Sequence, residues 1–124
     1  MKRISLLLVP LLLASCAAPP SSAPRRAAAE LAGRKAGAPQ HCISFDRLEG
    51  LRVSDTDRHM LLYGRGGMIW ANDLGPECGF SVNDSLISEP LSRYCRGDLV
   101  RSLDHVSQIP GPTCALGDFV PYKR

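Results

Sequence analysis

The sequence predicts a mainly β protein: a small, disulfide-stabilised barrel or curled antiparallel sheet of about five strands, preceded by a signal peptide and a disordered tether. Two observations predict this fold. Short apolar runs alternate with glycine, aspartate and proline turns between residues 41 and 122, as strands and their connections do. The same stretch carries Cys42, Cys78, Cys95 and Cys114, and an even number of cysteines in a small exported domain indicates disulfides.

Residues 1–15 have the features of a secretory signal. Lys2 and Arg3 form a positive start, and residues 4–13 are apolar, with Pro10 among them. This apolar run is far below the roughly 20 residues that span a bilayer. It is therefore interpreted as a cleaved signal and not as a transmembrane helix.

The run Leu13-Ala14-Ser15-Cys16 resembles the bacterial lipobox at every position. The resemblance implies a diacylglyceryl group on the Cys16 thiol, cleavage before Cys16 and acylation of the new amino terminus, which together form a stable membrane anchor. Ala17 stands where an aspartate typically retains Gram-negative lipoproteins in the inner membrane. In a Gram-negative host the expected location is therefore the periplasmic face of the outer membrane. The alternative is an ordinary signal with a chance cysteine, which would leave the protein secreted or periplasmic.

Residues 16–40 are predicted to form the lipidated cysteine and a flexible tether. Alanine, proline, serine and glycine dominate, and Leu31 is the only large apolar side chain in this segment, so it cannot bury enough surface to offset the entropy of ordering. Residues 27–35 favour a transient helix at most. The expected folded domain covers residues 41–124.

The charges divide between these two parts. Residues 17–40 hold four Lys or Arg against Glu30, a net charge of +3, whereas residues 41–124 hold nine Lys or Arg and eleven Asp or Glu, a net charge of −2. The basic tether is suited to anionic headgroups. No basic face with interleaved aromatic residues indicates nucleic-acid binding.

The strands are predicted in order along the domain. A hairpin is expected around Gly64-Arg65-Gly66-Gly67, whose glycines supply the positive φ of the turn. Asp55 and Asp57 precede this hairpin and are expected to accept hydrogen bonds from backbone amides. A brief helix or turn is expected at residues 88–94, and a breaker segment at 108–112. The expected strands cover residues 51–54, 59–63, 68–71, 99–103 and 117–122.

Four cysteines allow three disulfide pairings. The preferred pairing is Cys42–Cys114 with Cys78–Cys95, because the first bond would tie the two ends of the domain and the second would clamp an internal loop. The spacings are long, no Cys-x-x-Cys occurs and only His41 neighbours a cysteine. These spacings disfavour a metal site, and no cofactor is expected.

The sequence around the cysteines resembles an uncharacterised family of short exported proteobacterial proteins, many of them described as lipoproteins of unknown function. The landmarks are Cys42-Ile43-Ser44, Cys95-Arg96-Gly97-Asp98 and Cys114-Ala115-Leu116-Gly117-Asp118-Phe119-Val120-Pro121-Tyr122, with Asn72-Asp73-Leu74 shortly before Cys78. The resemblance covers about residues 41–122. It implies export and a domain boundary, and it carries no activity with it.

No catalytic constellation is apparent. His41, His59 and His105 have no nucleophile beside them in the sequence, so each is expected to be a surface or half-buried residue. Phosphate-loop, nucleophile-elbow and zinc-protease motifs do not occur. The tripeptide Arg96-Gly97-Asp98 matches an adhesion motif, but it is better interpreted as a turn in which Asp98 accepts a backbone hydrogen bond.

Three function classes are left open. The favoured one is a non-enzymatic binding or accessory module, held at the membrane through its lipid anchor and binding an envelope protein or a cell-wall component. Trp70, Phe80 and Tyr94 are the candidate contact residues, with a core position as the alternative for Trp70. The other two classes are an inhibitor of cell-wall hydrolases, similar in architecture to lysozyme inhibitors, and an uncharacterised periplasmic enzyme.

Overall fold

The computed structural model describes residues 28–46, 49–89 and 92–124, so the predicted signal peptide and Cys16 lie outside the described residues. These parts of the chain form ten strands and one 3-10 helix, which confirms the predicted β class. The strands make three open sheets, so the fold is a set of curled sheets and not a closed barrel. No helix in these ranges is long and apolar enough to cross a bilayer.

The largest sheet has five strands in the order β1-β10-β5-β4-β3, with antiparallel neighbours. Its centre is the predicted hairpin of β4 and β5, whose turn contains Gly64 and Gly66 at φ values of +84° and +71°, a conformation that glycine adopts without strain. The strands are β1 (Lys35–Ala36), β3 (Arg52–Val53), β4 (Met60–Tyr63), β5 (Met68–Asp73) and β10 (Phe119–Lys123).

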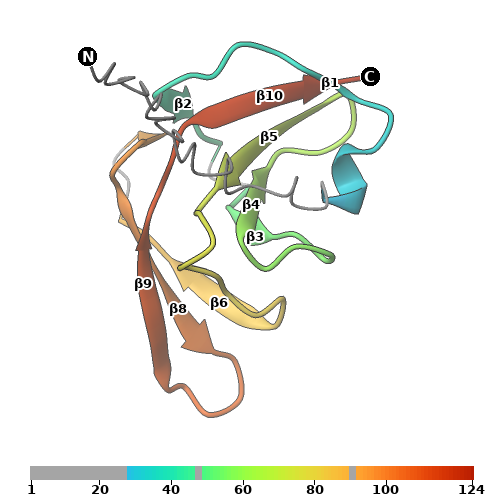
Figure 1. Cartoon of the computed structure of the whole chain (residues 1–124). Helices are drawn as coiled ribbons and strands as arrows, with labels where there is room; N and C mark the ends of the chain where they lie inside the picture. The colour runs from blue at the N-terminus through green and yellow to red at the C-terminus, as the bar shows by residue number, and fades with distance from the viewer. Residues whose placement is uncertain (1–27, 47–48, 90–91) are drawn as a thin grey trace, which may run out of the picture.

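Two smaller antiparallel sheets complete the molecule. In one of them β2 (Cys42–Ser44) pairs with β7 (Arg93–Cys95). In the other the order is β6-β8-β9, and these strands are β6 (Asp84–Ile87), β8 (Leu99–Asp104) and β9 (Pro110–Ala115). The three-stranded sheet projects away from the five-stranded one, below it in Figure 1.

The main core lies where the three sheets meet. It combines Leu61 and Tyr63 of β4 with residues from both smaller sheets, among them Tyr94 and Val100. Because side chains alternate along a strand, Leu62 of β4 points to the opposite face of the sheet, where it joins a second cluster. Both faces of the five-stranded sheet are therefore covered.

The second face is covered by the segment that the sequence assigns to the tether. Ala28, which immediately precedes the 3-10 helix η1 (Ala29–Leu31), and Leu31, the last residue of this helix, are buried against it. Both oxygens of the Glu30 carboxylate accept hydrogen bonds, from the Asp55 backbone N–H at 2.8 Å and from the Ser54 hydroxyl at 2.9 Å. Residues 28–40 thus belong to the folded domain. The predicted boundary at residue 41 is too late, because these tertiary contacts leave no local pattern in the sequence.

Further contacts hold this segment along its length. Arg34 donates hydrogen bonds from its guanidinium to the backbone carbonyls of Gly66 and Gly67, at 2.6 and 3.2 Å. Strand β1 pairs with β10, and Gln40 forms an isolated bridge with Phe119. The segment therefore crosses the sheet from the β4–β5 turn to the far edge.

The strand predictions have mixed outcomes. Five strands lie where they were expected, namely β3, β4, β5, β8 and β10. The breaker predicted at residues 108–112 was wrong in its second half, because β9 begins at Pro110. A proline fits there because β9 is an edge strand of its sheet, and an edge strand tolerates a missing N–H. The helix or turn expected at 88–94 is not formed by its described residues, since Arg93 and Tyr94 belong to β7.

The four domain cysteines form two disulfides, but the preferred pairing was wrong. Cys42 is bonded to Cys95, and Cys78 to Cys114. Cys42 and Cys95 are directly opposite each other in the β2–β7 register, with Cα atoms 4.0 Å apart. Cys114 lies on β9 with its Cα atom 6.0 Å from that of Cys78. Strand pairing sets the Cys42–Cys95 bond, and the other two cysteines then form the second bond.

Candidate functional site

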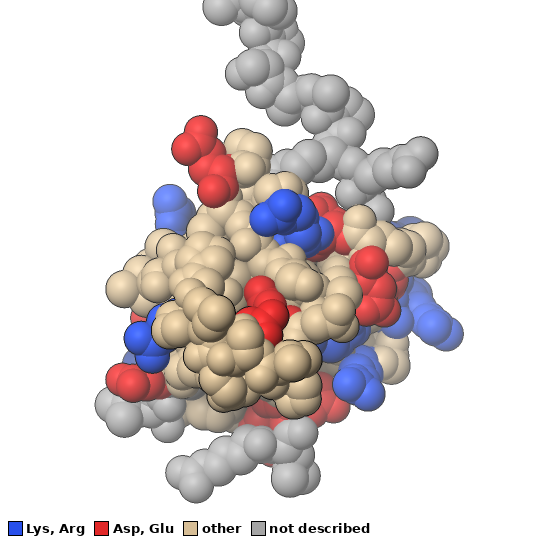
Figure 2. All heavy atoms as spheres, turned by 90° about the horizontal axis from the view of Figure 1, so that it is seen from below, with Lys and Arg blue, Asp and Glu red and all other residues tan. Residues whose placement is uncertain are grey.

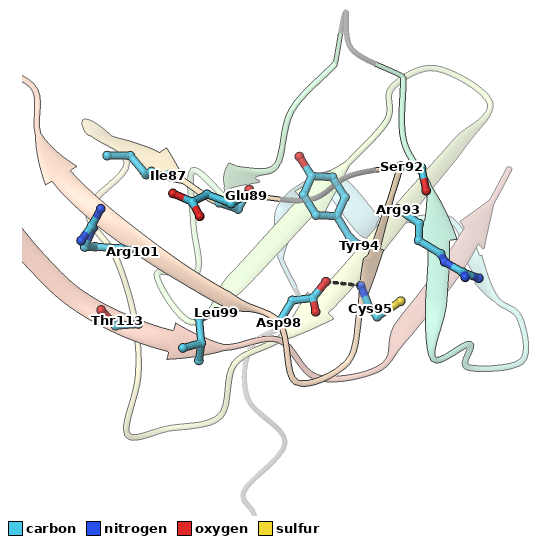
Figure 3. Close-up of a pocket in the computed structure, with 11 residues that line it drawn as sticks. Ile87, Glu89, Ser92, Arg93, Tyr94, Cys95, Asp98, Leu99, Arg101 and Thr113 are labelled. Atoms are coloured by element: carbon cyan, nitrogen blue, oxygen red, sulfur yellow. Dashed lines mark hydrogen bonds between the residues drawn. The ribbon is translucent and has the colours of Figure 1, made fainter.

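A groove of about 790 Å³ lies beside the three-stranded sheet. Such a volume is typical of sites that bind small molecules or short peptides. Its lining comes from β6, β7 and β8 and from the β6–β7 and β7–β8 connections, with one residue of β9 (Figure 3). The lining residues are Ile87, Ser88, Glu89, Ser92, Arg93, Tyr94, Cys95, Asp98, Leu99, Arg101 and Thr113.

One end of the groove is the outer face of the three-stranded sheet. Ile87 of β6 and Thr113 of β9 are both opposite Arg101 of β8 in the strand register, so these three side chains form a row across the sheet. Leu99 lies two residues before Arg101 on the same face and is 64% exposed. The outer face therefore presents an apolar surface with a cation at its centre.

Charged groups of both signs border this surface. Ile87, Glu89 and Arg101 lie together at one end of the groove, and Arg93 lies at the other end (Figure 3). Within the described residues, Arg101, Arg93 and Glu89 make no side-chain hydrogen bond or ion pair. These charges are therefore available to a ligand.

The middle of the groove is held rigidly by β7. Tyr94 is 5% exposed, and its ring contacts those of Phe45 and Tyr63, at centroid distances of 5.0 and 6.0 Å. Asp98 accepts a hydrogen bond from the Cys95 backbone N–H at 2.8 Å through Oδ2. This bond confirms the interpretation of Arg96-Gly97-Asp98 as a turn.

The two most specific landmarks of the sequence meet beside this turn. The N–H of Gly97 donates to the carbonyl of Leu116, and the N–H of Leu116 donates to the carbonyl of Asp98. Asp118 accepts a hydrogen bond from Arg96 Nη1 at 3.3 Å and lies 3.5 Å from His41 Nδ1. Both landmarks therefore have a structural role, because their hydrogen bonds join the β7–β8 turn to the β9–β10 connection.

The predicted contact residues do not form an exposed patch. Phe80 is 1% exposed and Tyr94 is 5% exposed, so both belong to the core, and the expectation that they mark a contact surface was wrong for them. Trp70 is partly buried and packs against the same core. Only Tyr94 lies in the groove wall. Aromatic residues in apolar strands are buried here because the domain has few large side chains to fill its centre.

The histidines lie apart from one another. His59 accepts or donates one hydrogen bond between its Nδ1 and the Cys78 carbonyl, at 2.8 Å. His41 and His105 are exposed. Across residues 28–46, 49–89 and 92–124, no three His, Cys, Asp or Glu side chains gather as metal ligands would.

Apart from Tyr94, Cys95 and Asp98, the groove residues were not singled out by the sequence. Leu99, Arg101 and Leu103 alternate with the inward-facing Val100 and Ser102, and this alternation does predict one outward face. What the sequence does not provide is the partner strands, because β6 and β9 were not predicted. Ile87 and Glu89 could therefore not be placed beside Arg101.

Comparison with known proteins adds no assignment to this geometry. No family model, no curated protein and no solved structure matches the chain.

Proposed function

We propose that this chain is a lipid-anchored envelope protein whose domain is a binding module for an extended peptide that carries a carboxylate. The peptide belongs to a cell-wall component or to an envelope protein, and it lies in the groove. The observation that carries the proposal is the row of Ile87, Arg101 and Thr113, an apolar surface with an unpaired guanidinium at its centre.

The spacing along β8 supports a peptide ligand. Residues on one face of a strand recur about every 6.6 Å, and Leu99 and Arg101, which both line the groove, follow this spacing on the outer face. An extended peptide has the same repeat, so successive side chains on one of its faces can meet the apolar Leu99 and the cationic Arg101 in turn. A guanidinium binds a carboxylate through two parallel hydrogen bonds, and Glu89 at the rim is suited to an amine of the same ligand.

Binding to isolated cell-wall sacculi and to the soluble peptides released from them tests this function. The purified full-length protein is compared with Arg101→Gln and with Arg65→Gln, which removes an exposed arginine in the β4–β5 turn, outside the groove. Loss of a charge-assisted pair lowers affinity by about tenfold or more. We expect this loss for Arg101→Gln alone. Equal binding by both variants would contradict the role of the groove.

The lipid anchor is tested separately. Replacement of Cys16 by serine removes the thiol that the lipobox resemblance requires, so the variant is expected in the soluble periplasmic fraction, while the unaltered chain sediments with membranes. Membrane retention of the Cys16→Ser variant would contradict the anchor.

Inhibition of cell-wall hydrolases and an enzymatic activity stay predictions from the sequence, and no contact in the groove favours either of them.

A further inference from the structure

A second surface, separate from the groove, lies at the free end of the three-stranded sheet. Three large apolar side chains are exposed there: Val82 by 52%, Val106 by 91% and Ile109 by 64%. Asp84 at the start of β6 is opposite Asp104 at the end of β8, so Val82, just before β6, and the β8–β9 turn lie at the same end. We call Val82, Val106 and Ile109 the distal tip. It is the lower end of the molecule in Figure 1.

The backbone of the tip is fixed by local hydrogen bonds. Oδ1 of Asp104 accepts from the N–H groups of Val106 and Ser107, at 3.0 and 2.7 Å, and from the Ser107 hydroxyl at 2.8 Å. These bonds also lower the pKa of Asp104 below its ordinary value of 3.8. Asp84 accepts a hydrogen bond from the Ser81 N–H at 3.1 Å and thereby holds the neighbouring turn.

Such a tip can bind with little loss of entropy, because its conformation exists before a partner arrives. Exposed apolar side chains that gather in one place mark contact surfaces more often than scattered ones do. The tip shares no residue with the groove lining, so its role can be separated from the proposed peptide binding.

One of the two sheet edges next to the tip, β9, disfavours docking through an added strand. Pro110 and Pro112 lie on the edge strand β9, and proline has no N–H to donate to a further strand. A partner is therefore not expected to extend the sheet at β9, and the side chains of Val106 and Ile109 are the exposed groups beside this edge.

The charges around the tip indicate which class of partner it can bind. Asp84 and Asp104 lie opposite each other beside the apolar side chains, and Figure 2, which views the molecule from this end, shows acidic atoms within a largely uncharged surface, with basic atoms elsewhere on the same face. In a two-fold pair of tips these carboxylates would face their own copies, and like charges repel. Anionic headgroups would be repelled as well.

We propose that the distal tip docks into an apolar recess, rimmed by basic residues, on a partner protein of the envelope. Val106 and Ile109 enter the recess, and Asp84 and Asp104 face its rim. This interaction is independent of the groove, and either can exist without the other.

Site-specific photo-crosslinking of the full-length protein in its host cells tests this proposal. A benzophenone side chain is placed at Val106, at Ile109 or, as a control, at exposed Arg65 in the β4–β5 turn. We expect one discrete adduct from Val106 and Ile109 and none of that mass from Arg65. Mass spectrometry of the adduct should locate the crosslink in a partner peptide with apolar residues flanked by Lys or Arg.

Two further variants make the result specific. With the crosslinker at Val106, Ile109→Ser should lower the adduct yield by about tenfold, because one buried apolar side chain is lost. Asp84→Asn, which removes only the charge, should lower it several-fold. Four outcomes would each overturn the proposal. These are an adduct of twice the chain mass, crosslinks to lipid alone, no adduct, and an adduct yield that neither substitution changes. Loss of binding to sacculi by Arg101→Gln has no bearing on this outcome.

Discussion

The two larger sheets of this molecule differ in how many of their faces are covered. The five-stranded sheet is packed on one face by the smaller sheets and on the other by Ala28 and Leu31. Among the described residues, the three-stranded sheet packs its inner face alone, through residues such as Val100 and Cys114. Its outer face carries the exposed Leu99 and Arg101, and its free end carries Val106.

This difference separates stability from recognition. A domain of this size buries a modest share of its surface, so a sheet that leaves one face open gives up part of the apolar burial that stabilises a fold. Both candidate binding surfaces lie on the sheet that does so. The five-stranded sheet and the two disulfides therefore have to supply most of the stability of the domain, including that of the three-stranded sheet with its open outer face.

The largest expected effect compares two leucines on strands of the two sheets. Leu61 of β4 is fully buried, whereas Leu99 of β8 is 64% exposed. Leu61→Ala should lower the free energy of unfolding by about 2–5 kcal/mol through lost burial and a cavity, and Leu99→Ala by less than about 0.5 kcal/mol. Denaturant unfolding of both variants measures the two values. Similar losses would mean that the open face is covered in solution.

The second prediction concerns the bond that joins the two regions. Cys78 follows β5 of the large sheet, and Cys114 lies on β9 of the open one. Replacing both cysteines by alanine removes a loop closure of 36 residues, worth roughly 4 kcal/mol in the chain-entropy model. The matched control replaces Cys42 and Cys95 in the same way, and both variants are compared by thermal unfolding.

Hydrogen exchange distinguishes the two disulfides. Without the Cys78–Cys114 bond, the backbone amides of β8 and β9 should be the first to lose protection against hydrogen exchange. The packing of its inner face is then the main interaction that holds the three-stranded sheet in place. Loss of Cys42–Cys95 should release β2 and β7 first. The same order of release in both variants would contradict a separate role for each bond.

What the sequence predicted correctly was local. The β4–β5 hairpin follows from apolar runs around Gly64 and Gly66, and the turn role of Asp98 follows from its place after a glycine. Strands β2 and β7 were missed because each has three residues, and their pairing is set by the opposite positions of Cys42 and Cys95. Such pairing joins residues far apart in the sequence and leaves no periodic pattern.

The candidate sites were missed for the same reason. Arg101 becomes a candidate only when Ile87 and Thr113 lie beside it on neighbouring strands. Glu30 sits in an alanine-rich segment that has the composition of a linker, and its partners Ser54 and Asp55 are more than twenty positions away. Composition predicted disorder there, and specific contacts overrode it.

The third prediction addresses this covering segment. Burial alone would raise the pKa of Glu30, but hydrogen bonds from the backbone N–H groups of Asp55 and of Glu30 itself and from the Ser54 hydroxyl, with the charge of Arg52, lower it below 4.5. A carboxyl whose pKa is lower in the folded state stabilises the fold above its unfolded pKa. This contribution is lost as the pH falls from about 4.5 through the folded value.

Glu30→Gln keeps the size of the side chain and removes its charge. We expect it to lower the free energy of unfolding by about 1 kcal/mol at neutral pH and to weaken this acid dependence. The amides of Leu31 and Arg34, which donate to the carbonyls of Ala28 and Leu31, should exchange faster in the variant than in the unaltered chain. Exchange that is unchanged at neutral pH would show that Leu31 alone holds the segment.

The smallest expected effect on stability is at the distal tip. Val106 and Ile109 are 91% and 64% exposed, so the double variant Val106→Ser and Ile109→Ser should change the free energy of unfolding by no more than about 0.5 kcal/mol. The matched control is Val100→Ser on the same hairpin, where a fully buried side chain should cost about 2–4 kcal/mol through lost burial and an added polar group. If the tip variant were as unstable as Val100→Ser, the tip side chains would have to be buried in the folded protein, like those of the covered sheet. A stable tip variant that loses its partner would assign these apolar side chains to recognition, since the folded domain gains nothing from exposing them.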